Sequence, residues 1–174
     1  MRLLIRDLAQ VATPAGRGAP LRGSQLGEMD VLDDAYVLCH GDTIESVGRM
    51  HELPVLDDDV VELDARGLCA IPGLVDCHTH AAFGGDRVEE FSLRAAGASY
   101  EELHARGGGI LSTVRATRAA GEDGLRAAVE LHRDWMRRHG TTTFESKSGY
   151  GLDRDTELAS LRAIRDAGGV PTWL

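Results

Sequence analysis

The sequence is poor in cysteine, in aromatic residues and in long hydrophobic runs. Its three cysteines are odd in number and form no Cys-x-x-Cys pair, which argues against a disulfide framework and predicts a reducing, cytoplasmic compartment. The longest apolar run, residues 68–75, is far shorter than the about 20 residues that a membrane-spanning helix needs. The first seven residues become charged before any signal-peptide core begins. A secreted or membrane-spanning protein is therefore not expected.

The chain also lacks a cluster of basic residues. It has 19 Lys and Arg against 28 Asp and Glu, a formal net charge of −9 over 174 residues. Because nothing offsets this acidity locally, neither nucleic acid nor an anionic membrane surface is an expected partner. The 43% hydrophobic and 27% charged residues are typical of a globular domain, and the length predicts one domain with at most a small appendage.

Residues 1–67 predict a small β domain. Short apolar or alternating segments at 3–8, 36–39, 43–47 and 61–64 predict strands, and the last of these is expected to be half-buried. The glycine-containing segment 40–42 separates two strands and indicates a hairpin. Residues 13–29 are rich in glycine and proline and predict a loop. Short strands joined by turns suggest an antiparallel unit.

From residue 68 onward, strands alternate with helices. Residues 68–75 are nearly all apolar, which predicts a strand buried on both faces. Further strands are expected at 141–144 and 170–174, and Asp153 or Asp155 is expected to cap the helix between them. Two helices are predicted from apolar residues at helical spacing: Leu125, Ala128, Val129, His132, Trp135 and Met136 on the first, and Leu158, Leu161 and Ile164 on the second. This alternation predicts an α/β fold with a parallel sheet.

Two histidines follow the apolar run. Side chains at alternate positions of a strand point to the same face, so His78 and His80 present their imidazoles side by side, as a metal site requires. The carboxyl end of a buried parallel strand is where β/α barrels place their active sites. The pair could equally be two unrelated histidines at a strand end. A catalytic metal usually has three protein ligands, so two alone do not complete such a site.

Other polar residues also gather in glycine-rich segments after the predicted strands. Arg87 is suited to hold a carboxylate by two hydrogen bonds, or it pairs with an acid among residues 86–90. The amides of residues 107–109 could bind an anion at a helix start, but the segment reads better as a turn that permits close backbone approach. Tyr150, between two glycines, either exposes its hydroxyl over a pocket or packs its ring. Glu145 and Lys147 share a strand face as an ion pair or a functional pair.

The segment IPGLVDCHTH at 71–80 resembles the opening motif of the amidohydrolase superfamily of metal-dependent hydrolases. Three later segments, in this order, are similar to the imidazolonepropionase family: FGGDR at 83–87, GGGILSTVRATR at 107–118 and KSGYGL at 147–152. The resemblance covers roughly residues 60 to 168. It implies a partial TIM-type (β/α) barrel in residues 68–174, preceded by a small, incomplete β-sandwich-like domain in residues 1–67.

The resemblance also implies a reaction and its residues. The family hydrolyses the cyclic amide of 4-imidazolone-5-propanoate to N-formimidoyl-L-glutamate in histidine degradation, with one zinc or iron ion per complete enzyme. His78 and His80 match the first two metal ligands. Arg87 matches the arginine that holds the small-molecule substrate, and Tyr150 matches the tyrosine that contacts substrate and product.

The family's other metal ligands, a histidine and an aspartate, and its catalytic glutamate have no counterpart before Leu174. The chain is therefore expected to be the amino-terminal part of the enzyme, inactive alone, and either a homo-oligomer or prone to aggregation. Two alternatives remain open. The chain could belong to another cyclic amidohydrolase or deaminase, in which Lys147 would be carboxylated to bridge two metals. It could also be a non-catalytic fragment.

Overall fold

The computed structural model describes residues 1–14, 20–57, 59–105 and 107–174, and within them the chain forms two compact units, Met1–Pro72 and Gly73–Leu174. The predicted domain boundary at 67/68 differs from this division by five residues. The reason is that Cys69 and Ala70 pair with the first strand and so stay with the first unit. No helix in the described ranges is long and apolar enough to cross a membrane.

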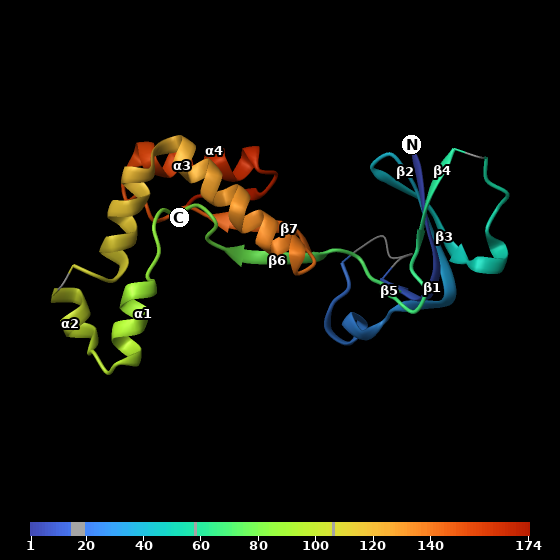
Figure 1. Ribbon diagram of the computed structural model, residues 1–174, viewed down its shortest axis with the longest axis horizontal. Coiled ribbons are helices and arrows are strands. Elements are labelled where there is room, and N and C mark those ends of the chain that lie inside the picture. The colour runs from blue at the N-terminus through green and yellow to red at the C-terminus, as the bar shows by residue number, and fades with distance from the viewer. Residues whose placement is uncertain (15–19, 58, 106) are drawn as a thin grey trace. The chain divides into compact units, whose positions relative to one another are not determined.

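The first unit is a mixed five-stranded sheet (Figure 1). Strands β1, β2 and β3 pair in antiparallel fashion, but β4 and β5 pair with β1 in parallel, so the predicted purely antiparallel arrangement is wrong. The elements of this unit are β1 (Arg2–Thr13), a 3-10 helix η1 (Gly23–Gly27), β2 (Asp30–His40), β3 (Thr43–Arg49), a 3-10 helix η2 (Met50–Glu52), β4 (Val60–Asp64) and β5 (Cys69–Ala70).

The predicted hairpin is confirmed. His40 pairs with Thr43, and Gly41 occupies the turn with φ = +62°, a conformation that glycine adopts without steric cost. Strand β2 is buried on both faces, because Ala35 and Val37 enter one hydrophobic cluster while Tyr36 and Leu38 enter another. Strand β4 is mostly exposed, so its expected half-burial is wrong.

The predicted loop at 13–29 is also only partly right. Strand β1 extends to Thr13 and η1 interrupts the rest of the segment, while residues 15–19 lie outside the described residues.

The second unit is a parallel sheet in the order β6-β7-β8, with its helices between the strands in sequence. This confirms the predicted βαβ pattern and the α/β class, and the three strands form no closed barrel within the described part of the chain. Its elements are β6 (Leu74–Thr79), α1 (Val88–Ala95), α2 (Tyr100–Ala105), α3 (Ile110–Arg138), β7 (Thr141–Lys147), α4 (Arg154–Asp166) and β8 (Val170–Thr172).

One strand prediction fails in this region. Residues 68–75 do not form a single buried strand, because Pro72, which lacks an N–H, and Gly73 separate β5 from β6. In β6, Leu74 is 49% exposed and Val75 is 67% exposed, since β6 is the edge of its sheet and pairs only with β7. Gly73 is needed here because a Cβ at this position would lie 2.1 Å from Oγ1 of Thr142.

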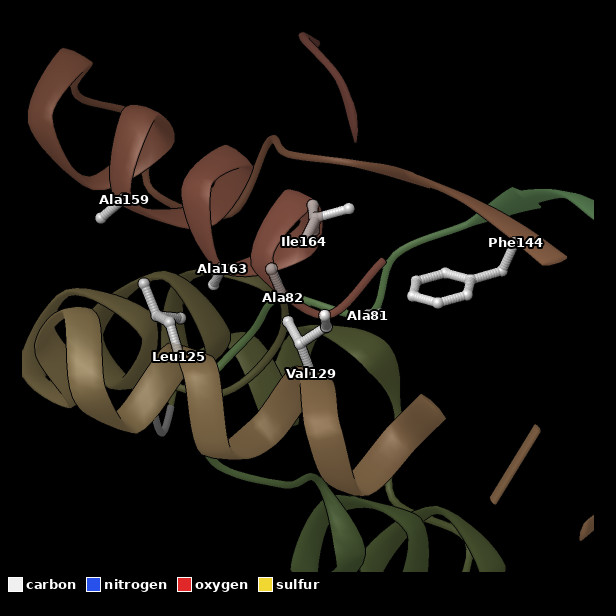
Figure 2. Close-up of a cluster of buried hydrophobic side chains, with 9 residues drawn as sticks. Ala81, Ala82, Leu125, Val129, Phe144, Ala159, Ala163 and Ile164 are labelled. Atoms are coloured by element: carbon white, nitrogen blue, oxygen red, sulfur yellow. The ribbon is translucent and has the colours of Figure 1, made fainter. Parts of the chain in front are cut away.

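The core of the second unit lies between α3, α4 and the sheet. Leu125 and Val129 on α3 face α4, and Phe144 of β7 reaches the same cluster (Figure 2). On α4 the packed face consists of Ala159, Ala163, Ala167 and Ile164. The predicted Leu158 and Leu161 are only half-buried, because small alanine side chains let the two helices approach closely.

The helix termini follow from local sequence. Asp153 is the N-cap of α4 and accepts a hydrogen bond from the backbone N–H of Thr156 (2.9 Å), which decides between the two predicted caps. Helix α3 begins after Gly109 and is interrupted at Gly121, whose φ of +62° is not helical. Trp135, expected on the buried face of α3, is half exposed.

Close packing of α3 against α4 leads to a stability prediction. Ala163 is almost fully buried, so Ala163→Leu inserts three carbon atoms where no space exists. We expect this substitution to lower the free energy of unfolding by about 1–3 kcal/mol. The midpoint of thermal unfolding measures the effect, and Ala119→Leu on the exposed face of α3 is the matched control. Equal midpoints for the two variants would show that the helix interface has room.

Candidate active site

The two predicted metal ligands lie at the carboxyl end of β6. His80 is half-buried, and its Nδ1 atom is buried without a hydrogen-bond partner among the described residues. His78 is exposed, and its backbone N–H donates to the carboxylate of Asp76 (3.2 Å). In the described part of the chain, no group of three His, Cys, Asp or Glu side chains gathers in metal-binding proximity. These residues therefore offer a pair of imidazoles rather than a closed site.

Hydrogen bonds from the neighbouring elements hold the segment that carries this pair. The hydroxyl of Thr79 donates to the carbonyl of Glu145 (2.7 Å), and the N–H of Ala81 donates to the buried Oγ of Ser146 (2.8 Å). From α3, Nδ1 of His132 lies 2.8 Å from the carbonyl of Ala81. The backbone after β6 is therefore fixed from both the adjacent strand and the helix above it.

His132 was expected to be a core residue of α3, but it is half-buried and its polar atom is used. Its ring stacks on Phe83, with ring centroids 4.8 Å apart and planes within 19°. The same Phe83 meets the edge of Tyr150 at 6.1 Å. These rings form one wall beside the histidine segment.

Three of the four predicted site residues line a single pocket. His80, Arg87 and Tyr150 surround a volume of about 450 Å³, together with Phe83 and Ile110. The rings of His80 and Tyr150 are in contact, with centroids 5.1 Å apart. The pocket thus combines an imidazole and a guanidinium from the loop after β6 with a phenol from the loop after β7.

Arg87 is held by an acid on α1. Its Nε and Nη2 atoms both donate to Oε2 of Glu90, the first at 2.8 Å, so the predicted pairing with a neighbouring acid occurs. Hydrogen bonding to Glu90 raises the pKa of the guanidinium, and hydrogen bonding to Arg87 lowers the pKa of Glu90. Among the described residues, no hydrogen bond to Nη1 of Arg87 is found.

The glycine segment 107–109 binds an anion from its own chain. The N–H of Gly109 donates to Oε1 of Glu90 (2.9 Å), and the hydroxyl of Ser112 donates to the same oxygen (3.1 Å). A Cβ on Gly108 would lie 2.9 Å from the carbonyl oxygen of Leu103, so the predicted close backbone approach occurs. Glu90 therefore joins the start of α3 to Arg87.

Glu145 and Lys147 form an ion pair at the end of β7. The Lys147 ammonium donates to both carboxylate oxygens of Glu145, at 2.7 and 2.8 Å. These bonds, with others from the side chain of Thr172 and the N–H of Thr79, lower the pKa of Glu145 to about 2. Of the two predicted roles, the structure supports the ion pair.

Sequence reasoning missed one carboxylate that lies beside the predicted residues and left another undecided. It did not find Glu157 of α4, which binds the loop that carries Tyr150, and it offered Glu90 only as one of several acids that could pair with Arg87. Neither belongs to a recognisable motif. The only local signal was an acid within one or two helical turns of a glycine-rich loop.

The sequence of this chain is similar to those of known imidazolonepropionases. Imidazolonepropionase from Rubrobacter xylanophilus is 60% identical over 171 residues, which cover 95% of this chain and 40% of the relative. The enzyme from Herpetosiphon aurantiacus is 48% identical over 177 residues, covering 98% and 41%. The chain is similar to the amino-terminal part of the imidazolonepropionases. The resemblance inferred from the motifs is thereby confirmed. The chain spans about 40% of the length of these imidazolonepropionases.

Solved structures agree on the fold. Guanine deaminase from E. coli matches the whole chain with a TM-score of 0.59 at 15% identity, over 36% of that enzyme. A triazine hydrolase from Arthrobacter aurescens matches 99% of the chain with a TM-score of 0.57 at 21% identity, over 35% of its length. These neighbours show that the fold of the chain recurs in about a third of the length of each enzyme. No family model matches the chain.

The ion pair at the end of β7 leads to a prediction about pH. The pKa of Glu145 is about 2 in the folded chain against an ordinary value of 4.5, so its stabilising effect is present above about pH 4.5 and is lost as the pH falls toward 2. We expect Glu145→Gln to have a shallower fall in thermal midpoint over this pH range than the unsubstituted chain. Glu130→Gln, at an exposed acid on α3, is the control and should retain the original slope. Equal slopes for all three proteins would contradict the prediction.

Proposed function

We propose that this chain forms part of a metal-dependent hydrolase that opens the ring of 4-imidazolone-5-propanoate to N-formimidoyl-L-glutamate. The observation that carries the proposal is the single pocket lined by His80, Arg87 and Tyr150. His80 belongs to the segment that resembles the amidohydrolase superfamily, and Arg87 and Tyr150 belong to segments that resemble the imidazolonepropionase family. High identity to imidazolonepropionases over nearly the whole chain supports the same assignment.

The fold supports this proposal at a coarser level. We infer that β6, β7 and β8, with α3 and α4, are the first units of a TIM-type (β/α) barrel, and that the first unit belongs to a β-sandwich-like domain. The predicted residues lie after the carboxyl ends of β6 and β7, the end at which such barrels carry their active sites.

His78 and His80 fit a zinc or iron ion. They stand two residues apart at the carboxyl end of β6, and the buried Nδ1 of His80 has no partner in the described residues, which makes that imidazole available as a ligand. A bound metal of this kind supplies a hydroxide from water near neutral pH and polarises a carbonyl. An atrazine chlorohydrolase from Arthrobacter aurescens, a fold neighbour with a TM-score of 0.54, was solved in complex with zinc. This complex supports metal dependence.

The remaining pocket residues bind and orient the substrate. The Nη1 end of Arg87 binds the propanoate carboxylate, while Glu90 keeps the guanidinium plane in place. The Tyr150 hydroxyl contacts the substrate, and the rings of Phe83 and Tyr150 provide an apolar wall. Holding both ends of the molecule makes attack on the lactam carbonyl an oriented, effectively intramolecular step.

Substitution of Arg87 tests the substrate assignment. Arg87→Lys keeps the charge but loses the planar pair of donors. We therefore expect binding of the transition state to weaken by about 1–3 kcal/mol, measured as a lower kcat/KM for imidazolonepropanoate. The assay uses the complete enzyme, made by joining this chain to the remaining residues of the Rubrobacter xylanophilus relative. Arg126→Lys on the exposed face of α3 is the control. Unchanged kcat/KM for Arg87→Lys would show that Arg87 does not hold the substrate.

Metal titration of the 174-residue chain tests the histidine pair. Two imidazoles leave the other positions of the ion to water, so we expect weak zinc binding, with occupancy well below one per chain after dialysis. Elemental analysis measures the occupancy, and His78→Ala with His80→Ala should abolish the binding seen before dialysis. His139→Ala at the end of α3 is the control. Chelator-resistant, stoichiometric zinc would reveal protein ligands other than this pair.

A further inference from the structure

The loop that carries Tyr150 is bound by one buried carboxylate. Oε2 of Glu157 accepts the N–H of Gly149 (2.6 Å), and Oε1 accepts those of Gly151 (2.7 Å) and Leu152 (2.8 Å). The hydroxyl of Ser148 donates to the same carboxylate. Every residue from 148 to 152 except Tyr150 therefore donates a hydrogen bond to Glu157.

The backbone of this loop needs such support. Gly149 has φ = +117°, and Leu152 has φ = +54°, a left-handed conformation that a leucine adopts only at an energetic cost. A Cβ on Gly151 would lie 2.7 Å from Cβ of Thr156, so the loop runs directly against the first turn of α4. Three hydrogen bonds from backbone N–H groups to the carboxylate of Glu157 compensate for this local strain.

A second side chain holds the loop from the opposite helix. Nε of Arg118 on α3 donates to the carbonyl of Gly151 (2.6 Å) and lies 3.0 Å from the carboxylate of Asp153. The backbone on either side of Tyr150 is thus fixed by Glu157 through its N–H groups and by Arg118 through a carbonyl. The loop geometry leaves Tyr150 directed at His80 and Phe83, whose rings it contacts.

The Glu157 side chain is buried but charged. The residue is 4% exposed, and none of the ion pairs found in the described residues includes it. Burial alone would raise the pKa of its carboxyl, but the hydrogen bonds from Ser148 and from the amides of Leu152, Gly149 and Gly151 outweigh burial and hold the pKa below its ordinary value. Because the hydrogen bonds found on the Glu157 carboxylate come from residues 148–152, the carboxylate exerts its effect on that loop.

We propose that Glu157 is the positioning residue for Tyr150: its carboxylate fixes the backbone of residues 148–152 so that the tyrosine ring and hydroxyl face the pocket beside His80. The pocket-facing consequence rests on the proposed function, in which Tyr150 contacts substrate and product. The structural part of the proposal does not depend on any activity.

Fluorine NMR of the 174-residue chain tests the structural part. The chain has three tyrosines, Tyr36, Tyr100 and Tyr150, so labelling with 3-fluorotyrosine yields three signals that single Tyr→Phe variants assign. In Glu157→Gln, the amide NH₂ cannot accept from the loop. We expect the Tyr150 signal to shift or broaden while the Tyr36 signal, from the other unit, stays unchanged.

Two further variants complete this test. Asp155→Asn removes an exposed carboxylate from the same turn of α4 and should leave all three signals in place. If Glu157→Gln also displaces the Tyr100 signal, which comes from the same unit as Glu157, that unit has unfolded and Glu157→Asp decides. This variant retains the charge with a shorter reach, and a Tyr150 signal that moves alone supports the proposal. An unmoved Tyr150 signal in the folded Glu157 variant overturns it.

Kinetics in the complete enzyme test the consequence for substrate. We expect Glu157→Gln to lower kcat/KM for imidazolonepropanoate by about ten- to a hundredfold per folded molecule. In the Tyr150→Phe background the same substitution should have a much smaller effect, because a residue that acts through Tyr150 is coupled to it. Additive effects would overturn the positioning role. Absence of any hydrolysis by the unsubstituted enzyme would refute the proposed function, and the fluorine result would then decide the proposal alone.

Discussion

Buried polar side chains bind the backbone of the loops that follow β6 and β7, and the candidate active site depends on these bonds. Loops at this edge run in conformations that leave N–H groups without strand or helix partners. The N–H of Ala81 donates to the hydroxyl of Ser146, and the N–H of Gly84 donates to the hydroxyl oxygen of Thr117 (3.0 Å). The carboxylate of Glu157 accepts hydrogen bonds from three backbone N–H groups. An unpaired buried amide costs free energy comparable to a lost hydrogen bond, so these side chains determine which loop conformations are stable.

Glu90 and Glu157 hold glycine-rich loops in the same way. Glu90 accepts from a backbone amide of the glycine segment and from Arg87, and Glu157 accepts from backbone amides around Tyr150. In each case a carboxylate on a helix holds a glycine-rich loop and with it a side chain that lines the pocket. Glycine makes the loops able to approach closely, and the carboxylate then removes the freedom that glycine brings.

The helices supply the rigidity on which these carboxylates depend. Alanines on α4 pack against Leu125 and Val129 of α3 (Figure 2). From these two helices, Glu157 and Arg118 both bind the loop around Gly151. The sheet contributes through register, since Thr79 pairs with Ser146 and sets the histidine segment beside the end of β7. Site residues thus rest on secondary structure whose packing does not involve them.

Local sequence alone determined the hairpin around Gly41, the parallel βαβ order and an aspartate cap at the start of α4, without deciding between Asp153 and Asp155. These features depend on interactions between residues close in the chain: alternation, turn conformation and capping. The sequence motifs resemble those of a known family, and this resemblance singled out Arg87 and Tyr150.

Only the tertiary structure decided the partners of those residues. The contacts of Glu90 with Gly109, Arg118 with Gly151 and His132 with Ala81 join positions 19, 33 and 51 residues apart. The burial of each strand was likewise undecided by composition, because Leu74 and Val75 lie on an edge strand and are exposed, while residues 35–38 of β2 are buried on both faces. Hydrogen bonds and burial of this kind depend on which elements the fold brings together, and no local pattern in the chain carries that information.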